Sequence, residues 1–277
     1  MAIAFAFLSM ACAAALDLAL KHRSRAGTSP GRQLILIGAA WSIVSLVPVL
    51  CAPVPWTGVS LACGLISGIF GLAANLLLLL AMRGCEIGTC ATVYRLNLVP
   101  ATILAVVALD ETMTAGKAAA VTLAVGAVLL MASWRIGNGP RFLAAAVIAC
   151  LLRACMALAY REGVVAGADA GCMLVVNGVV WLAGAAWWAA AREGWRGRFA
   201  SAELRWGLGV GLLATGSAAF LAQALARAPV TAVLPISQLS FVATTLAACL
   251  LLGERLTRRK AVALGLAAGA IGILALP

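Results

Sequence analysis

Two arginines lie inside apolar stretches of the sequence, where a permanent charge needs a specific reason to be retained. Arg95 lies within VYRLNLVPA, and Arg153 lies within VIACLLRACMALAY. A guanidinium group offers a planar set of donors that matches a carboxylate or a phosphate in bidentate fashion. These residue types in apolar surroundings therefore point to the binding of an anion.

One carboxylate, that of Asp17, also lies well inside an apolar stretch, and it allows two interpretations. It can form a purely structural ion pair with Arg153, or it can pair with Lys21, which lies four residues further along a helix. One acid cannot neutralise both arginines and Lys21. The surplus positive charge favours an anionic group on a substrate, such as a carboxylate, phosphate or phosphonate, and leaves Asp17 as the candidate for proton coupling.

The sequence offers little else that could carry a reaction or hold a metal. Its single histidine, His22, lies beside Lys21 and Arg23, and none of its nine cysteines forms a CxxC pair. One carboxylate in an apolar stretch is too few for paired acid and base catalysis. We therefore expect no metal, no cofactor and no catalytic residue, which makes an intramembrane enzyme the less favoured interpretation.

The elements that position these residues follow from the composition, which is 64% apolar and 10% charged. Apolar stretches of about 20 residues can cross the roughly 30 Å hydrocarbon core of a membrane. We expect an integral membrane protein of the bacterial inner membrane, in contact with lipids and with no nucleic-acid partner. Ten spans are predicted, over residues 2–20, 33–50, 58–82, 88–108, 115–134, 142–160, 170–191, 203–226, 230–251 and 258–276.

An internal repeat relates the two halves of the chain. A shift of 143 positions aligns residues 96–127 with 239–270 without a gap, and 14 of the 32 positions are identical. The halves, 1–137 and 138–277, each carry five spans, and five is odd, so the second half enters the membrane in the opposite orientation. The predicted fold is an all-α membrane protein with ten transmembrane helices as two inverted five-helix repeats.

The ends of both repeats carry a family resemblance. The segments LDETMTAGKAAAVTLAVGAVLL (109–130) and LGERLTRRKAVALGLAAGAIGILAL (252–276) resemble the repeat ends of EamA-type members of the drug/metabolite transporter superfamily. Asp110 departs from the usual glycine. The resemblance implies a ten-helix bundle whose first four helices in each repeat surround a central cavity, with the fifth helices (115–134 and 258–276) packed at the side.

The repeat also pairs polar residues between the two halves. Polar faces within a membrane turn inward, toward each other or toward water, so the paired positions are candidates to line a substrate cavity together with Arg153. The pairs are Arg95 with Gln238, Asn97 with Ser240, and Thr102 with Thr245. Further candidates for hydrogen bonds or aromatic walls are Tyr94, Asn75, Gln223, Asn177, Tyr160 and Trp181.

Other motifs favour structural roles. Glu111 and Glu254 lie near Thr114 and Thr257, which are well placed to cap the helices that follow, and favourable helix-start electrostatics explain both acids. Glycines spaced four apart allow close helix packing. These pairs are Gly64 with Gly68, Gly207 with Gly211, and Gly265 with Gly269.

The favoured function is that of a secondary transporter for a small polar or amphipathic metabolite, anionic or zwitterionic, working by alternating access as a monomer or weak dimer. A lipid or lipid-linked substrate flippase is the alternative. Fifteen of the 20 Lys and Arg residues follow odd-numbered spans, and the positive-inside rule then places both termini outside the cytoplasm. The family resemblance implies the opposite orientation, and we base our expectation on the charges.

Overall fold

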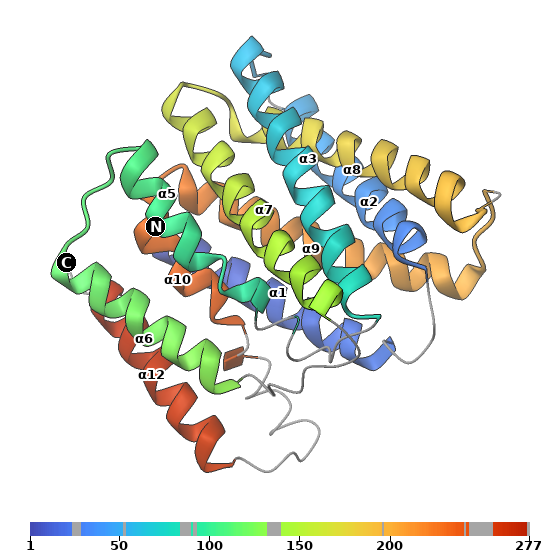
Figure 1. Cartoon of the computed structure of the whole chain (residues 1–277). Coiled ribbons are helices and arrows are strands. Elements are labelled where there is room, and N and C mark those ends of the chain that lie inside the picture. The colour runs from blue at the N-terminus through green and yellow to red at the C-terminus, as the bar shows by residue number, and fades with distance from the viewer. Residues whose placement is uncertain are drawn as a thin grey trace.

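The computed structural model describes residues 1–23, 29–51, 54–83, 90, 93–131, 140–195, 197–240, 242–243 and 257–275. Within these ranges the chain forms helices and no strand, which confirms the predicted all-helical class. The helices are α1 (Ala2–Arg23), α2 (Pro30–Cys51), α3 (Gly58–Ala81), α5 (Leu98–Ala108), α6 (Ala115–Met131), α7 (Pro140–Val165), α8 (Ala170–Glu193), α9 (Ser201–Leu225), α10 (Val230–Gln238) and α12 (Arg258–Ala275) (Figure 1).

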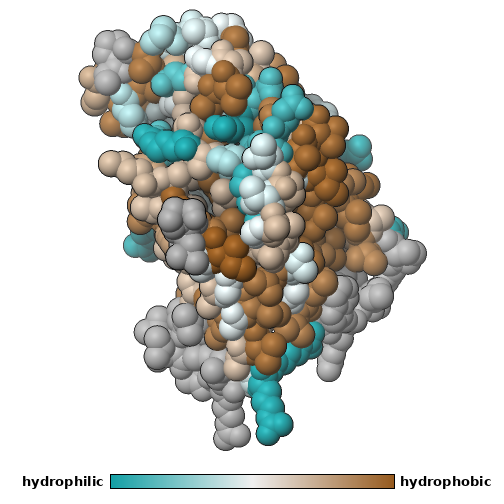
Figure 2. Space-filling view, turned by 90° about the vertical axis from the view of Figure 1, so that its left-hand side faces the viewer, coloured by the Kyte–Doolittle hydropathy of each residue, from teal (hydrophilic) through white to brown (hydrophobic). Residues whose placement is uncertain are grey.

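The apolar surface of several helices matches a membrane environment. Helices α2, α3, α8 and α9, and residues 141–165 of α7, are long and apolar enough to cross a membrane. Exposed large apolar side chains such as Ile43, Leu50 and Ile69 lie on the outside of the described chain. On the face seen in Figure 2, hydrophobic residues cover a broad area of the middle, and hydrophilic residues gather above it and at the bottom.

Helices of the two halves pack on each other throughout the bundle. Helix α2 packs on α8, α3 on α7 and α8, α1 on α9, and α9 on α2. Helices α6 and α12 lie side by side at the margin of the bundle, as Figure 1 shows. The α2–α8 contact is close because a Cβ added at Gly38 would lie 2.6 Å from the Leu182 nitrogen, and one added at Gly178 would lie 2.8 Å from the Ser42 nitrogen.

Of the three pairs of glycines spaced four apart, two have the predicted packing role. Gly64 and Gly68 lie against α8, and Gly207 and Gly211 lie against α2, with a Cβ at any of them within 3.0 Å of a neighbouring atom. The third pair differs. A Cβ at Gly265 would meet nothing within 4 Å, since this residue faces away from the helix that packs on α12.

Two of the predicted spans are interrupted at corresponding positions. In the predicted span 88–108, residues 93–95 are helical, residues 96–97 form a turn, and α5 begins at Leu98. In the predicted span 230–251, α10 ends at Gln238 and Leu239 forms a turn. The shift of 143 residues relates position 96 to position 239. Pro100 and Pro235 lack the backbone N–H that continuous helices would need, and both lie close to these breaks.

The bundle has two ends that can be defined by their contacts. At one end, called here the Glu111 end, Glu111 contacts the start of α10, Arg161 of α7 contacts the end of α9, and Ser60 of α3 contacts the start of α8. At the other, called the Arg32 end, Arg32 of α2 pairs with Glu203 of α9. Described basic residues gather near the Arg32 end, namely Arg32, Arg83, Arg141, Arg192, Arg198, Arg205, Arg258, Arg259 and Lys260.

Candidate functional site

The two helix breaks bring Arg95 to the polar residues of the other half. The Arg95 Nη1 atom donates to the Gln238 carbonyl oxygen at 3.2 Å and to the Ser240 hydroxyl oxygen. The carbonyl is available because α10 ends at Gln238, and a break in a membrane helix leaves backbone groups that need partners. The structure thus brings together Arg95, Gln238 and Ser240, which the repeat had paired or placed on matching faces.

Two further residues of this face are buried. The Asn97 side chain is fully buried, and its Nδ2 donates to the Tyr94 carbonyl oxygen at 2.6 Å, which fixes the turn between Tyr94 and α5. The Asn97 Oδ1 and the Thr102 Oγ1 have no hydrogen-bond partner among the described residues. Thr245, the counterpart of Thr102, lies outside the described residues.

Arg153 occupies the middle of α7, with neutral groups around it. Its Nη1 lies 3.2 Å from the Met156 Sδ, a weak acceptor. Among the described residues, no carboxylate pairs with Arg153. The side chain of Asp17, proposed as its structural partner or as a proton-coupling group, lies outside the described part of the chain.

Two tyrosine side chains lie near Arg153, and Asn75 lies beside one of them. The Tyr94 hydroxyl lies near the Asn75 side chain and near the guanidinium groups of Arg153 and Arg95. The Asn75 Nδ2 also donates to the Gly71 carbonyl oxygen at 2.9 Å. The Tyr160 hydroxyl lies within electrostatic reach of Arg153. Arg153, Arg95, Tyr94, Asn75 and Tyr160 therefore form one group, called here the central polar group.

Helix α8 adds two predicted residues to this region. The Asn177 Nδ2 donates to the Ser67 hydroxyl oxygen of α3 at 3.2 Å. Trp181 packs on Trp41 of α2, with ring centroids 5.2 Å apart and the rings tilted by 40°, and its Nε1 faces Gly71 of α3. Both side chains are buried at the junction of α3, α7 and α8.

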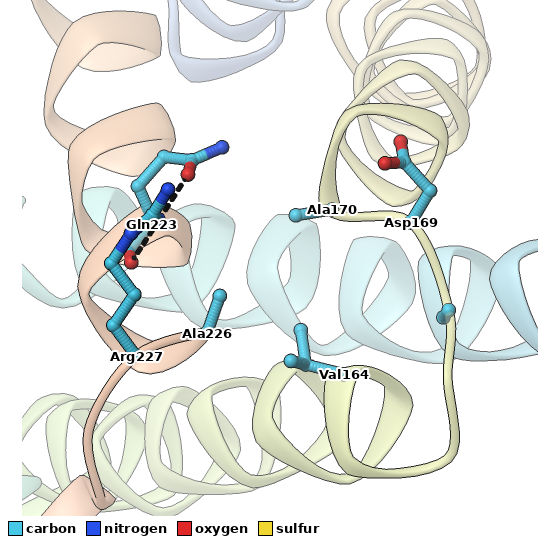
Figure 3. Close-up of a pocket in the computed structure, with 7 residues that line it drawn as sticks. Val164, Asp169, Ala170, Gln223, Ala226 and Arg227 are labelled. Atoms are coloured by element: carbon cyan, nitrogen blue, oxygen red, sulfur yellow. Dashed lines mark hydrogen bonds between the residues drawn. The ribbon is translucent and has the colours of Figure 1, made fainter. Parts of the chain in front are cut away.

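Gln223 is the predicted residue that the structure separates from this group. It lines a pocket of about 380 Å³ at the Glu111 end, between α9 and the α7–α8 connection. Arg227 donates to the Gln223 carbonyl oxygen at 2.8 Å and to its side-chain oxygen (Figure 3). Val164 lines the same pocket eleven residues beyond Arg153, roughly 17 Å along α7 at 1.5 Å per residue.

Glu111 lies at the start of a helix, as predicted. This helix is α10 of the other half and not the helix that follows Glu111 in the sequence. Its carboxylate accepts from the Val230 nitrogen at 2.7 Å, and from the nitrogen and hydroxyl of Thr231 at 3.0 and 2.9 Å. These groups start α10 in the other half. Thr114 and Thr257 cap α6 and α12 as expected, each accepting from a backbone nitrogen at 3.3 Å.

Sequence reasoning did not identify Arg161 as a partner of Glu111. The Arg161 Nε lies 3.7 Å from the Glu111 Oε1, and its Nη1 donates to the Leu225 carbonyl oxygen at 2.8 Å. The sequence offered one signal for this role. Among the basic residues near the ends of the predicted spans, only Lys117, Arg161 and Arg227 lie on the side where even-numbered spans end, so few cations were available as partners for Glu111.

Comparison with known proteins informs the fold. No protein-family model matches the chain, and no curated protein matches it. A solved structure described only as "Crystal structure of protein" is similar, with a TM-score of 0.83 and 14% sequence identity. The match covers 99% of this chain and 98% of that chain. At this level of identity the similarity shows a shared fold over nearly the whole length.

Proposed function

We propose that the protein is a secondary transporter that binds a small organic anion or zwitterion at Arg153 and moves it across the membrane. The observation that carries the proposal is the charge of Arg153, which lies mid-helix with no carboxylate partner among the described residues. A charge at the centre of a membrane helix is costly and is typical of a functional site. The guanidinium is suited to a carboxylate or phosphate.

The arrangement of the helices supports alternating access. Corresponding contacts recur in the two halves, since α3 packs on α7 while α1 packs on α9, and the glycine pairs pack on α8 and on α2. The helix breaks also recur at positions 96 and 239. Broken helices near the middle of an inverted repeat are a common construction of substrate sites in transporters. We therefore propose ten spans in two inverted repeats, of the EamA type, in the bacterial inner membrane.

The two arginines have different roles in this proposal. Arg95 is held by a backbone carbonyl and a hydroxyl across the two halves, so it joins the helix breaks. Arg153 meets only the Met156 sulfur within hydrogen-bond distance among the described residues. Arg153 is therefore the primary anion-binding group, with Tyr94 near it and Asn75 next to Tyr94.

Anion uptake by protein reconstituted into liposomes tests the proposal. Arg153→Gln should leave the protein folded, because it removes a costly charge, while uptake falls steeply. Arg153→Lys should restore only part of the uptake, since lysine lacks the planar fork. Arg205→Gln is the matched control, because Arg205 is exposed near the Arg32 end. Unchanged uptake in Arg153→Gln would exclude the proposed site.

A structural pairing of Arg153 with Asp17 gives a different result. Removing either partner of a buried pair leaves the other uncompensated, which costs about 3–5 kcal/mol of stability. Both single variants, Arg153→Gln and Asp17→Asn, would then be destabilised, and the double variant would recover. That outcome would assign Arg153 to the fold and not to a substrate.

A further inference from the structure

Three buried polar atoms, one in the central polar group and two beside it, have no hydrogen-bond partner among the described residues. They are the Tyr160 hydroxyl on α7, the Trp181 Nε1 on α8 and the Asn177 Oδ1 on α8. The three residues are 2%, 4% and 0% exposed. Buried polar atoms in native proteins are nearly always paired, so three unpaired atoms in one region need an explanation.

The three atoms belong to a strip that leads away from Arg153. A Cβ added at Gly71 would lie 2.8 Å from the Met156 Sδ and 3.1 Å from the Trp181 Nε1, so both atoms pack closely against Gly71 and lie near each other. The same Met156 Sδ contacts the Arg153 guanidinium. Trp181 is therefore the first unpaired group reached from Arg153.

Tyr160 and Asn177 form the next layer, one helical turn further along. Tyr160 follows Met156 by four residues on α7, and Asn177 precedes Trp181 by four residues on the antiparallel α8. Ser67 of α3 joins this layer, because its hydroxyl accepts from the Asn177 Nδ2. The Tyr160 hydroxyl lies beside the Ser67 hydroxyl without a hydrogen bond of normal geometry.

The donor and acceptor properties of the three atoms restrict which groups can form hydrogen bonds with them. A tryptophan Nε1–H only donates, an asparagine Oδ1 only accepts, and a tyrosine hydroxyl does both. A bare anion could accept from Trp181 but could not donate to Asn177. A hydroxyl group on the substrate can accept from one member of the strip and donate to another.

We propose that the strip of Trp181, Tyr160 and Asn177 binds a hydroxyl group of the substrate, which makes the substrate a hydroxylated organic anion. The charged group lies at Arg153, and the hydroxyl lies roughly 5–10 Å from it, since Met156 and Tyr160 follow Arg153 by three and seven residues. This inference rests on the proposed anion site at Arg153. It adds a second recognition element that distinguishes hydroxylated anions from plain ones.

Binding of matched anion pairs to the purified full-length protein tests the strip. The probes are ω-hydroxy carboxylates and the unsubstituted carboxylates of the same chain length, from butyrate to octanoate, with affinity measured by thermal shift titration. The wild-type protein should bind the best-fitting hydroxylated anion about tenfold or more tightly than its plain counterpart, because a site built for a hydroxyl rejects the analogue without it.

Substitutions in the strip test whether it causes the preference for hydroxylated over plain carboxylates. Tyr160→Phe and Trp181→Phe remove one hydrogen-bonding group each and should bring the affinity ratio close to one, with little change for the plain carboxylates. Trp187→Phe is the matched control, because Trp187 lies on the same helix and is 67% exposed. If these atoms have only structural roles, the strip variants will change the melting temperature while the ratio persists.

The outcomes separate the two proposals. Equal affinity for both members of every pair, with loss of binding in Arg153→Gln, would overturn the hydroxyl site and leave the anion site standing. A preference that survives Tyr160→Phe and Trp181→Phe would also overturn the strip. Binding that survives Arg153→Gln, or no binding of any carboxylate, would overturn the anion site on which this inference rests.

Discussion

The two ends of the bundle are held together in different ways. At the Glu111 end, a carboxylate that is only 6% exposed receives three hydrogen bonds from the start of α10 and lies beside Arg161. At the Arg32 end, Arg32 pairs with Glu203 while its side chain remains 33% exposed. Screening by water weakens exposed pairs far more than buried ones. The Glu111 end is therefore the more firmly connected one.

The repeat does not supply a second copy of the Glu111–Arg161 pair. Under the shift of 143 residues Glu111 corresponds to Glu254, but Arg161 corresponds to Leu18. Corresponding helices share their packing, whereas the ionic contacts at the two ends differ. This comparison indicates that the repeat determines how the helices pack, and that the groups at each end set the relative stability of the ends.

The largest expected effect concerns which end faces the cytoplasm. Basic residues near the Arg32 end predict that it is cytoplasmic, which leaves Cys51 of the Glu111 end outside, where it is exposed. A membrane-impermeant maleimide should label Cys51 in intact cells, and Cys51→Ser should lose that label. Labelling of Cys51 only after permeabilisation would support the orientation that the EamA resemblance implies.

Glu111→Ala should give the largest loss of stability at either end. It leaves Arg161 and the first amides of α10 without their buried acceptor, which costs about 3–5 kcal/mol in the free energy of unfolding. Denaturant unfolding in detergent measures the loss. Glu162→Ala is the control, because Glu162 is exposed on α7 near the same end. Equal effects of the two substitutions would contradict the connection described at Glu111.

Arg161→Leu introduces the residue that the first repeat has at the corresponding position. The variant loses the bond to the Leu225 carbonyl and the pairing with Glu111, so we expect a smaller loss of about 1.5–3 kcal/mol. A double-mutant cycle with Glu111→Gln measures how much the two residues depend on each other. A coupling energy of zero would show that their proximity does not contribute to stability.

Arg32→Gln should have the smallest effect. Exposed ion pairs contribute about 0–1 kcal/mol and weaken as salt is added, so the unfolding free energy should fall only slightly at low salt and hardly at all at high salt. The same unfolding measurement at two salt concentrations checks this. A loss as large as that of Glu111→Ala would remove the difference between the two ends.

The sequence predicted the helical class and much of the packing because both depend on local patterns. Apolar stretches predicted the helices. The spacing of Gly64 with Gly68 and of Gly207 with Gly211 predicted the close helix contacts. The helix breaks were not predicted, since apolar residues lie on both sides of Asn97 and the stretch reads as one continuous span. Asn97 and the following Pro100 were the available signals.

The candidate site was predicted in part. Arg95, Arg153, Tyr94, Asn75 and Tyr160 were all predicted to line the cavity, and the structure places them in one region, although Tyr160 is the last residue of its predicted span. Gln223 does not join them, since it lies near the end of α9, where it faces a pocket at the Glu111 end. The Glu111–Arg161 contact joins residues 50 positions apart, and periodicity within one helix carries no information about such a partner.

Two side chains of opposite charge contact the two ends of helix α10. Glu111 lies at its first residues, and Arg95 donates to the carbonyl of its last residue, Gln238. The peptide dipoles of a helix sum to a partial positive charge at the start and a partial negative charge at the end. This short helix therefore compensates an anion and a cation that lie roughly 13 Å apart, at 1.5 Å per residue over nine residues. The partial negative charge at the end of α10 thus lies beside the Arg95 guanidinium.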